Sequence, residues 1–395
     1  MGPDELAELR SPEGRALVAS LTPYDEAGAL AAGQAARRQG HPAPLVAAAQ
    51  SQARLRTRAR LRFGPPADRL WWSADTLEQA TRPPVAARRA ARFAAALPAG
   101  SLVADLGCGA GSDTWALAAA GLRVLAVDRD PLAAALAAAN ADEGGLADRV
   151  EVRCGDVREL DLSTVDAWFA DPARRAGGRR VLDPEGWSPP WSWVVDTATR
   201  VPAGMAKVAP GIDHAALPTG TTTEWVSDGG DLLEACVAWG PLADPAVGRR
   251  AALLPGGDVL IDSGGVPEPR IGPPGAYLLE PDPAVIRAGL VSVVAVALDG
   301  WLLDPRIAYI ATDADRTSPY AVRYEVLGEA PFALKSLRAH LRGLGYGDVI
   351  VKKRGVAVEP EELRRRLRLG GDGPTATLVL TRTDAGPLAL LVRRG

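Results

Sequence analysis

The feature that most constrains this chain is a glycine-rich segment that directly follows a short apolar run. Residues 102–106 read Leu-Val-Ala-Asp-Leu, as expected of a buried parallel strand, and Gly107-Cys108-Gly109-Ala110-Gly111 follows at once. Glycine suits such a turn because the backbone must bend sharply and let a ligand approach closely. An apolar helical pattern continues through Trp115 and Leu117. The segment therefore predicts a strand, a ligand-binding turn and a helix in succession.

Three further apolar runs each end at or near an acidic residue. Residues 124–127 end at Asp128, about 20 residues past the loop, where a carboxylate can hold ribose hydroxyls. Residues 150–153 precede Asp156, and residues 167–170 precede Asp171. Because ligands bind at the carboxyl ends of parallel strands, these acids are expected along one edge of a doubly wound α/β sheet. Runs at 204–208, 224–227 and 251–254 would complete seven strands, with residues 231–239 as a connecting helix.

The glycine spacing argues against a dinucleotide cofactor. That fingerprint would place its third glycine at the position of Ser112. Since no diphosphate need be bound, an acidic residue before the loop, Asp105, is tolerated and could meet a positively charged ligand group. Taken together, residues from Ser101 to Lys207 resemble class I S-adenosylmethionine-dependent methyltransferases.

This resemblance implies a cofactor, S-adenosyl-L-methionine, and a set of residues that hold it. It implies that the segment from Asp105 to Gly111 surrounds the methionine portion, that Asp128 holds the ribose, and that Asp156 contacts the adenine amino group. The candidate cofactor-binding residues are thus Asp105, Gly107, Cys108, Gly109, Gly111, Asp128 and Asp156.

The candidate catalytic residues follow the fourth strand. In amino-directed nucleic-acid methyltransferases this strand ends in Asn/Asp/Ser-Pro-Pro and an aromatic residue, and here it ends in Asp-Pro-Ala-Arg, so only the first two positions match. A covalent mechanism of the uridine-5 methyltransferases is disfavoured, because Cys236 lies in the predicted helix without the expected proline context. The candidates are Asp171, Pro172, Arg174, Arg175 and Lys207.

The order of motifs along the whole chain resembles bacterial class I methyltransferases with a THUMP-like domain. Residues 79–81 lead from the helical N-terminal part into the next one, as in that family. The predicted organisation is a helical N-terminal domain (1–98), a methyltransferase domain (99–265) and a small α/β C-terminal domain (266–395). In the last of these, residues 283–298 are expected to form one helix. THUMP domains bind RNA, so the resemblance implies an RNA substrate such as tRNA or rRNA.

The charge distribution favours a polyanionic partner. The net charge is −3, yet residues 1–98 hold 14 arginines against 9 acidic residues, and residues 320–395 hold 14 basic against 8 acidic residues. Arg54, Arg58 and Arg62 share one helix face at i, i+4 spacing, with no acidic residue between Glu26 and Asp68. That face, and the basic turn at 352–354, are equally expected to contact phosphates or to be solvated surface.

Other classes of function are disfavoured by what the sequence contains. Three cysteines and three histidines, all widely spaced, predict neither disulfides nor a metal site. No apolar run of about 18 residues is present, so no membrane span is expected. The first residues lack the pattern of a signal peptide, and a cytoplasmic protein is predicted, with its oligomeric state left open.

Three interpretations remain. The chain is an RNA methyltransferase, or a small-molecule or protein methyltransferase whose flanking domains form a lid and a dimer surface, because the fold alone hosts many substrates. A cofactor-binding regulatory protein is the third. Trp187, Trp191 and Trp193 could stack a base under the first interpretation, but packing at the sheet edge is the favoured role.

Overall fold

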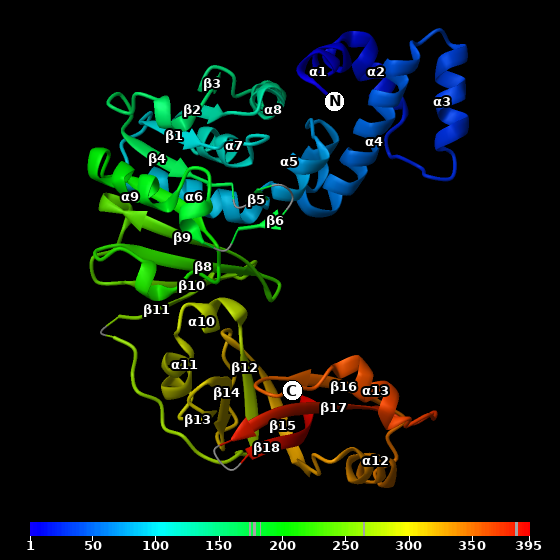
Figure 1. The fold of residues 1–395 in the computed structure, drawn as a ribbon, viewed down its shortest axis with the longest axis vertical. Coiled ribbons are helices and arrows are strands. Elements are labelled where there is room, and N and C mark those ends of the chain that lie inside the picture. The colour runs from blue at the N-terminus through cyan, green and yellow to red at the C-terminus, as the bar shows by residue number, and fades with distance from the viewer. Residues whose placement is uncertain (174, 177–178, 182, 264, 384–385) are drawn as a thin grey trace. The chain divides into compact units, whose positions relative to one another are not determined.

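The computed structural model describes residues 1–173, 175–176, 179–181, 183–263, 265–383 and 386–395. These residues divide into two compact units (Figure 1). The first unit contains residues 1–221 and 236–244, and the second contains residues 222–235 and 245–395. The chain passes between them three times, after residues 221, 235 and 244, and the second of these points lies within strand β9 (Asp231–Trp239). The division into three domains after residues 98 and 265 stays a prediction.

The first unit begins with helices, as the sequence predicts. Ser11 separates the first two by accepting a hydrogen bond from Gly14 N, and Gly64, with φ of 66°, ends the longest. The helices are α1 (Pro3–Arg10), α2 (Pro12–Ser20), α3 (Ala29–Arg38), α4 (Ala43–Phe63), α5 (Ala74–Gln79) and α6 (Pro83–Ala96), with a 3₁₀ turn, η1 (Pro65–Asp68), after α4.

A mainly parallel sheet follows in the first unit, where the strand order is β9-β7-β4-β1-β2-β3. Its parallel strands are β1 (Leu102–Leu106), β2 (Arg123–Asp128), β3 (Val150–Cys154), β4 (Ala167–Ala170) and β7 (Gly204–Val208). Helices α7 (Ser112–Ala119), α8 (Pro131–Glu143) and α9 (Trp191–Arg200) connect them. Short elements complete the unit: η2 (Val157–Glu159), β5 (Arg175–Ala176), β6 (Arg179–Arg180), η3 (Pro184–Gly186), η4 (His214–Ala216) and η5 (Gly240–Leu242). The predicted doubly wound sheet is confirmed, and its carboxyl edge receives the ends of β1, β2 and β4.

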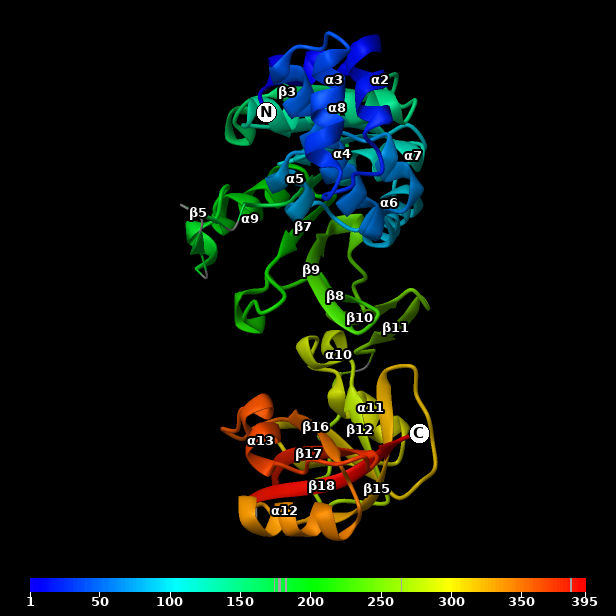
Figure 2. The same ribbon diagram turned by 90° about the vertical axis from the view of Figure 1, so that its right-hand side faces the viewer.

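Helix α8 joins the sheet to the N-terminal helices. It contacts β2 and β3, and it also contacts α1 (Figures 1 and 2). Leu136 and Ala139 of α8 share a buried apolar cluster with Leu9, Leu45 and other residues of the N-terminal helices. Because both faces of α8 are covered, its apolar residues are not confined to one stripe.

The second unit begins with strands β8 (Thr222–Asp228), β10 (Arg249–Leu254) and β11 (Asp258–Ile261). A seven-stranded sheet follows, in the order β13-β14-β12-β15-β18-β17-β16. Its strands are β12 (Tyr277–Pro281), β13 (Trp301–Asp304), β14 (Ile307–Thr312), β15 (Ala321–Ala330), β16 (Asp348–Lys353), β17 (Thr375–Thr383) and β18 (Gly386–Arg394). Its helices are α10 (Pro283–Arg287), α11 (Val291–Ala297), α12 (Leu334–Gly343) and α13 (Pro360–Leu367).

Two sequence predictions of helices are wrong. Residues 231–239 form strand β9 instead of a helix, so Cys236 lies in a strand. Ala235 to Trp239 are all buried, and a run that is apolar on both faces has no period that distinguishes a strand from a helix. The single helix expected at 283–298 is divided into α10 and α11, because Gly289 takes a left-handed conformation with φ of 70° between them. All seven runs that were expected to be strands form strands, namely β1, β2, β3, β4 and β7 of the first unit and β8 and β10 of the second.

Candidate functional site

The glycine loop lies between β1 and α7, at the carboxyl edge of the sheet. Gly107, Gly109 and Gly111 all have positive φ, of 92°, 56° and 84°. The amides of Gly107 and Cys108 both donate to the Val127 carbonyl of β2, which holds the loop against the neighbouring strand. A β-carbon at Gly107 would lie 3.1 Å from the Asp171 carbonyl oxygen. The glycine therefore lets the loop approach the end of β4, where the candidate catalytic residues begin.

Asp105 lies near the end of β1, just before this loop, and its carboxyl group is buried. It is 1% exposed, and its Oδ2 accepts a hydrogen bond from the Thr114 hydroxyl of α7. Its Oδ1 is buried without a hydrogen-bond partner among the described residues. Burial, and then the nearby carboxylates of Asp113 and Asp171, raise the pKa of Asp105 to about 7. An unsatisfied buried carboxyl oxygen is costly, so this atom is suited to receive a ligand's donor.

A buried group near Asp105 consists of Arg89, Asp113 and Thr81, of which the sequence analysis singled out only Thr81, as part of residues 79–81. Arg89 of α6 forms an ion pair with Asp113 of α7, and these residues are 4% and 7% exposed. Thr81 donates to the other carboxylate oxygen of Asp113 at 2.7 Å. The Arg89 guanidinium also lies 4.2 Å from the centroid of the Phe169 ring in β4. The segment at residues 79–81, singled out by resemblance alone, thus has a structural function in fixing α7.

Asp128 ends β2 and organises the loop from the opposite side. Its Oδ2 accepts from the Gly109 amide at 2.9 Å, and its Oδ1 accepts from the Asp130 amide at 2.9 Å. Each carboxylate oxygen can accept a further bond. Asp128 can therefore hold the glycine loop and two hydroxyl groups of a ligand together.

Asp156 and Cys108 have different surroundings. The Asp156 carboxylate accepts from the Arg158 guanidinium and amide, and these bonds lower its pKa to about 2. Cys108 is buried, and this burial, with Asp105 and Asp128 nearby, raises the pKa of its thiol well above the ordinary value. A thiol with a raised pKa is a poor nucleophile, because only the thiolate is a strong one. Cys108 therefore contributes to the site through its backbone.

Asp171 and Lys207 are brought together by neighbouring parallel strands. Ala170 of β4 pairs with Ala206 of β7, so the two following residues meet at the carboxyl edge. The Lys207 ammonium donates to Asp171 Oδ2 at 2.8 Å, and its side chain is 10% exposed against 26% for Asp171. The Asp171 amide donates to the Leu106 carbonyl of β1, and Pro172 is buried. The edge therefore holds a half-buried ion pair next to the glycine loop.

Two of the candidate catalytic residues have no described side chain. Arg174 lies outside the described residues. Of Arg175 only the backbone is described, at the start of β5. Their predicted contacts with phosphate stay predictions.

The tryptophans beyond β4 mainly pack. Trp187 and Trp191 are 3% and 7% exposed, and their rings meet edge to face with centroids 6.3 Å apart. Trp191 also packs on Trp239, which packs on Trp168. Packing, the favoured interpretation, is confirmed for these two residues.

Asn140 of α8 is a further residue that the sequence analysis missed. Its side chain is 4% exposed and binds the backbone amide and carbonyl of Trp71, at 2.7 and 3.1 Å. Its amide also donates to the Ala110 carbonyl in the glycine loop at 2.9 Å. Asn140 thus connects the loop to the N-terminal helical segment.

The predicted arginine face of α4 is only partly available. Arg54 forms an ion pair with Glu26 at 3.6 Å. Arg62 donates to the carbonyls of Leu77 and Ala80, which fixes the end of α5. Of the three arginines, only Arg58 is exposed without a partner among the described residues. The partners of Arg54 and Arg62 are not acids close to them in sequence, because Glu26 and α5 are brought to this face by the tertiary fold.

The basic turn at residues 352–354 is also paired with acids. Lys352 donates to Glu280 at 2.6 Å, and Arg354 lies 3.5 Å from the other oxygen of the same carboxylate. Lys353 pairs with Glu359 at 2.8 Å. These pairs connect the end of β16 with β12 and with the residue before α13, so the cations of the turn already have acidic partners.

Two kinds of feature are absent from the part of the chain that the structure describes. No group of three or more histidine, cysteine or acidic side chains is arranged to hold a metal ion. Among the same residues, no helix combines the length and the apolar character that a membrane crossing requires.

Three family models match segments of the chain. Residues 103–173 match a methyltransferase domain, and residues 321–394 match a domain described as THUMP domain-like. Residues 2–59 match a domain of unknown function, DUF8688. The first match contains the glycine loop, Asp105, Asp128, Asp156 and Asp171.

Whole proteins are also similar to this chain. It is 36% identical, over 322 residues, to an uncharacterised S-adenosylmethionine-dependent methyltransferase of Mycobacterium tuberculosis, found in two strains. That alignment covers 80% of this chain and 85% of the relative. A crystal structure of a presumed methyltransferase from Porphyromonas gingivalis W83 aligns with a TM-score of 0.74 at 23% identity, over 94% of this chain and 99% of that one. The second likeness shows a shared fold across nearly the whole chain.

Proposed function

Because the chain belongs to the S-adenosylmethionine-dependent methyltransferases and ends in a THUMP-like domain, we propose that it methylates RNA. The observation that carries this proposal is the match of residues 321–394 to the THUMP-like family. The same region holds more basic than acidic residues, which accords with a polyanionic substrate. Of its exposed cations, Lys335 on α12 and Arg365 on α13 have no ion-pair partner among the described residues. A tRNA or rRNA substrate would fit the cytoplasmic location that the sequence predicts.

The proposed cofactor site is the glycine loop with its three carboxylates. Two observations support it: Asp105 Oδ1 is buried without a partner, and a β-carbon at Gly109 would meet nothing within 4 Å, so the loop is open on that side. S-adenosylmethionine supplies an activated methyl group on a sulfonium when it is bound. In the proposal, Asp105 and the backbone from Gly107 through Cys108 to Gly111 hold its amino-acid portion. Asp128 holds the ribose and Asp156 the adenine amino group.

The proposed reaction centre is the pair of Asp171 and Lys207. Lys207 fixes one carboxylate oxygen of Asp171, and among the described residues the other oxygen has no hydrogen-bond partner. That free oxygen can accept the proton or hydrogen bond of an attacking group and hold it in line. Pro172 stiffens the turn that follows, because its ring fixes φ. Arg174 and Arg175 are proposed to contact phosphate.

A second candidate is methylation of a small molecule or a protein. The observation that favours it is the internal use of several cations expected to bind RNA. Arg54, Arg62 and the basic turn at residues 352–354 all bind groups of this chain. In that case the flanking regions would serve as a lid and a dimer surface.

Transfer of labelled methyl groups separates these substrates. The protein is incubated with labelled S-adenosylmethionine and total RNA, and portions of the product are digested with ribonuclease or protease before precipitation. Label that ribonuclease releases and protease does not, followed by a methylated nucleoside in the digest, is the expected result. Label that only protease releases, or that stays in small molecules, would replace the RNA assignment with the second candidate.

A further inference from the structure

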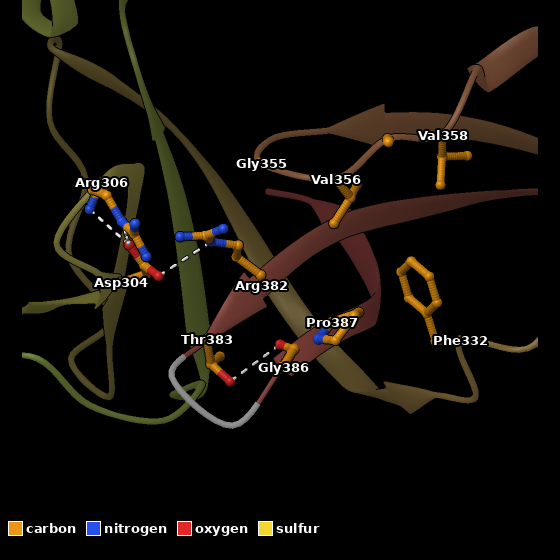
Figure 3. Close-up of a pocket in the computed structure, with 11 residues that line it drawn as sticks. Asp304, Arg306, Phe332, Gly355, Val356, Val358, Arg382, Thr383, Gly386 and Pro387 are labelled. Atoms are coloured by element: carbon orange, nitrogen blue, oxygen red, sulfur yellow. Dashed lines mark hydrogen bonds and ion pairs between the residues drawn. The ribbon is translucent and has the colours of Figure 1, made fainter.

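A pocket in the second unit lies outside the methyl-transfer site. Its volume is about 520 Å³, within the range of ligand sites. Its walls come from the turn after β13, the segment before α12, the loop after β16 and the hairpin of β17 and β18. Figure 3 shows its charged side chains at one end and its apolar ones at the other.

The charged end contains one carboxylate and two arginines. Asp304 is 1% exposed and accepts from the Arg306 backbone amide at 2.7 Å. Arg382 Nε donates to Asp304 Oδ2 at 3.3 Å, and Arg306 Nε lies 3.5 Å from Oδ1. The two arginines carry two positive charges and Asp304 carries one negative charge, so one positive charge remains at this end of the pocket. Among the described residues, the terminal amino groups of both guanidiniums have no other partner, so they can donate to an anion.

The apolar end contains an exposed aromatic ring. Phe332 is 37% exposed, whereas the leucine side chains of the helix that follows it, α12, are buried or half-buried. Val356, Val358 and Pro387 line the same end. A half-exposed phenyl ring at a pocket wall offers a flat surface on which a nucleobase can stack.

Gly355 shapes the wall between the two ends. Its φ is 72°, in the region that favours glycine. A β-carbon there would overlap the side chain of Ile307 and would lie 3.5 Å from Arg382 Cδ. The glycine therefore allows the β16 loop to pack closely beside the charged end.

We propose that this pocket binds one unpaired nucleotide of an RNA strand, with the base on Phe332 and the phosphate on Arg306 and Arg382. Positive charge that tracks a phosphate beside an aromatic stacking surface is the pattern by which proteins hold single-stranded nucleic acid. An acidic peptide would use the arginines but would not need a flat ring beside them. The inference rests on the proposed function, since it assigns part of the RNA-binding surface to residues that do not belong to the methyl-transfer site.

Binding of a single-stranded oligoribonucleotide of about ten nucleotides tests the proposal, measured by fluorescence anisotropy over a range of salt concentrations. Phe332→Ala should weaken binding about 5- to 150-fold, the range for loss of one stacked base, with the salt dependence unchanged. Phe332→Leu should give a similar loss, because it keeps apolar area without the ring. Arg306→Gln, at a side chain 75% exposed, should lower the slope of log affinity against log salt by about 0.7. Leu344→Ala, which removes another exposed apolar side chain of the same domain, is the matched control and should bind like the wild type.

The proposal is overturned if the pocket variants bind the oligonucleotide as the control does, or if the wild type does not bind it. It is also overturned if uridine or adenosine monophosphate binds and the strand does not, or if an acidic phosphopeptide displaces the strand without any effect of Phe332→Ala. Methyl transfer separates this result from the proposed function. RNA methylation with an unchanged KM in all three pocket variants would remove the pocket and leave the function. If those variants bind RNA more weakly but the wild type transfers no methyl group to RNA, the pocket assignment would stand and the proposed function would fall.

Discussion

The substitution Asp105→Asn should stabilise the ligand-free protein increasingly as the pH rises. Asp105 is buried, and its pKa rises from 3.8 to about 7 on folding. A raised pKa in the folded state favours folding at low pH, and this contribution is lost as the pH rises through the folded pKa. Between about pH 4 and about pH 7, therefore, ionisation of Asp105 opposes folding by a growing amount, and asparagine, which does not ionise, removes that opposition.

The magnitude follows from the size of the shift. Each pKa unit is worth about 1.4 kcal/mol, so a shift of about three units opposes folding by on the order of 4 kcal/mol at full effect. At about pH 5 only the first part of this penalty is present, on the order of 1.5 kcal/mol. The stability of the variant relative to the wild type should thus increase by roughly 2–3 kcal/mol between about pH 5 and about pH 8. The new amide adds a cost of about 1–3 kcal/mol if it is unpaired, but this cost is independent of pH.

Urea unfolding of the two proteins over this pH range gives the difference directly, because other titrating groups cancel. Glu151→Gln is the control: it removes an exposed surface carboxylate, 62% exposed, and its difference from the wild type should stay flat. A stability difference for Asp105→Asn that is as flat as the control would refute the argument that burial of this carboxyl opposes its ionisation.

Three further outcomes are expected from contacts at and around the site. Lys207→Met removes the donor to Asp171 and should lower turnover by about 10²-fold, with S-adenosylmethionine affinity by calorimetry unchanged; Lys353→Met, at a lysine that is paired with Glu359, should leave turnover as it is. Arg62→Gln should cost about 1–3 kcal/mol in urea unfolding because two carbonyls lose their donor, whereas equal stability of Arg62→Gln and the exposed-site variant Arg58→Gln would show that the bonds to α5 contribute nothing. Asn140→Ala should destabilise the protein by about 2–4 kcal/mol, since the buried Trp71 amide is left unpaired. It should also weaken S-adenosylmethionine binding, because the Ala110 carbonyl of the glycine loop loses its donor. A loss of stability without any change in affinity would limit Asn140 to packing.

The sheet and the position of the site could be predicted because the signals are local. The glycine loop directly follows its strand, and the acids at 128, 156 and 171 lie at the ends of theirs or within two residues of them. Parallel pairing then brings the strand ends to one edge without further information. The meeting of Asp171 and Lys207 follows from the same rule, because β4 and β7 are neighbours.

The supporting contacts could not be predicted, because their partners are distant in sequence. Asn140 meets Trp71, and Arg54 meets Glu26, only once the helices have packed. An arginine on a helix face has the same sequence signature whether its partner is a phosphate, a solvent molecule or a distant acid. Strand β9 was missed for another reason: a run that is buried on both faces has no periodicity to reveal it.

Single-turnover methyl transfer to RNA by the wild type and by Asp171→Asn tests the central claim most directly. S-adenosylmethionine affinity is measured by calorimetry on the same preparations. Asparagine keeps the shape of the side chain and removes its charge, so the account predicts labelled RNA from the wild type. Transfer should be about 10²-fold slower or more in the variant, at unchanged cofactor affinity. RNA that stays unlabelled by the wild type, or a variant that transfers methyl groups at the wild-type rate, would contradict it.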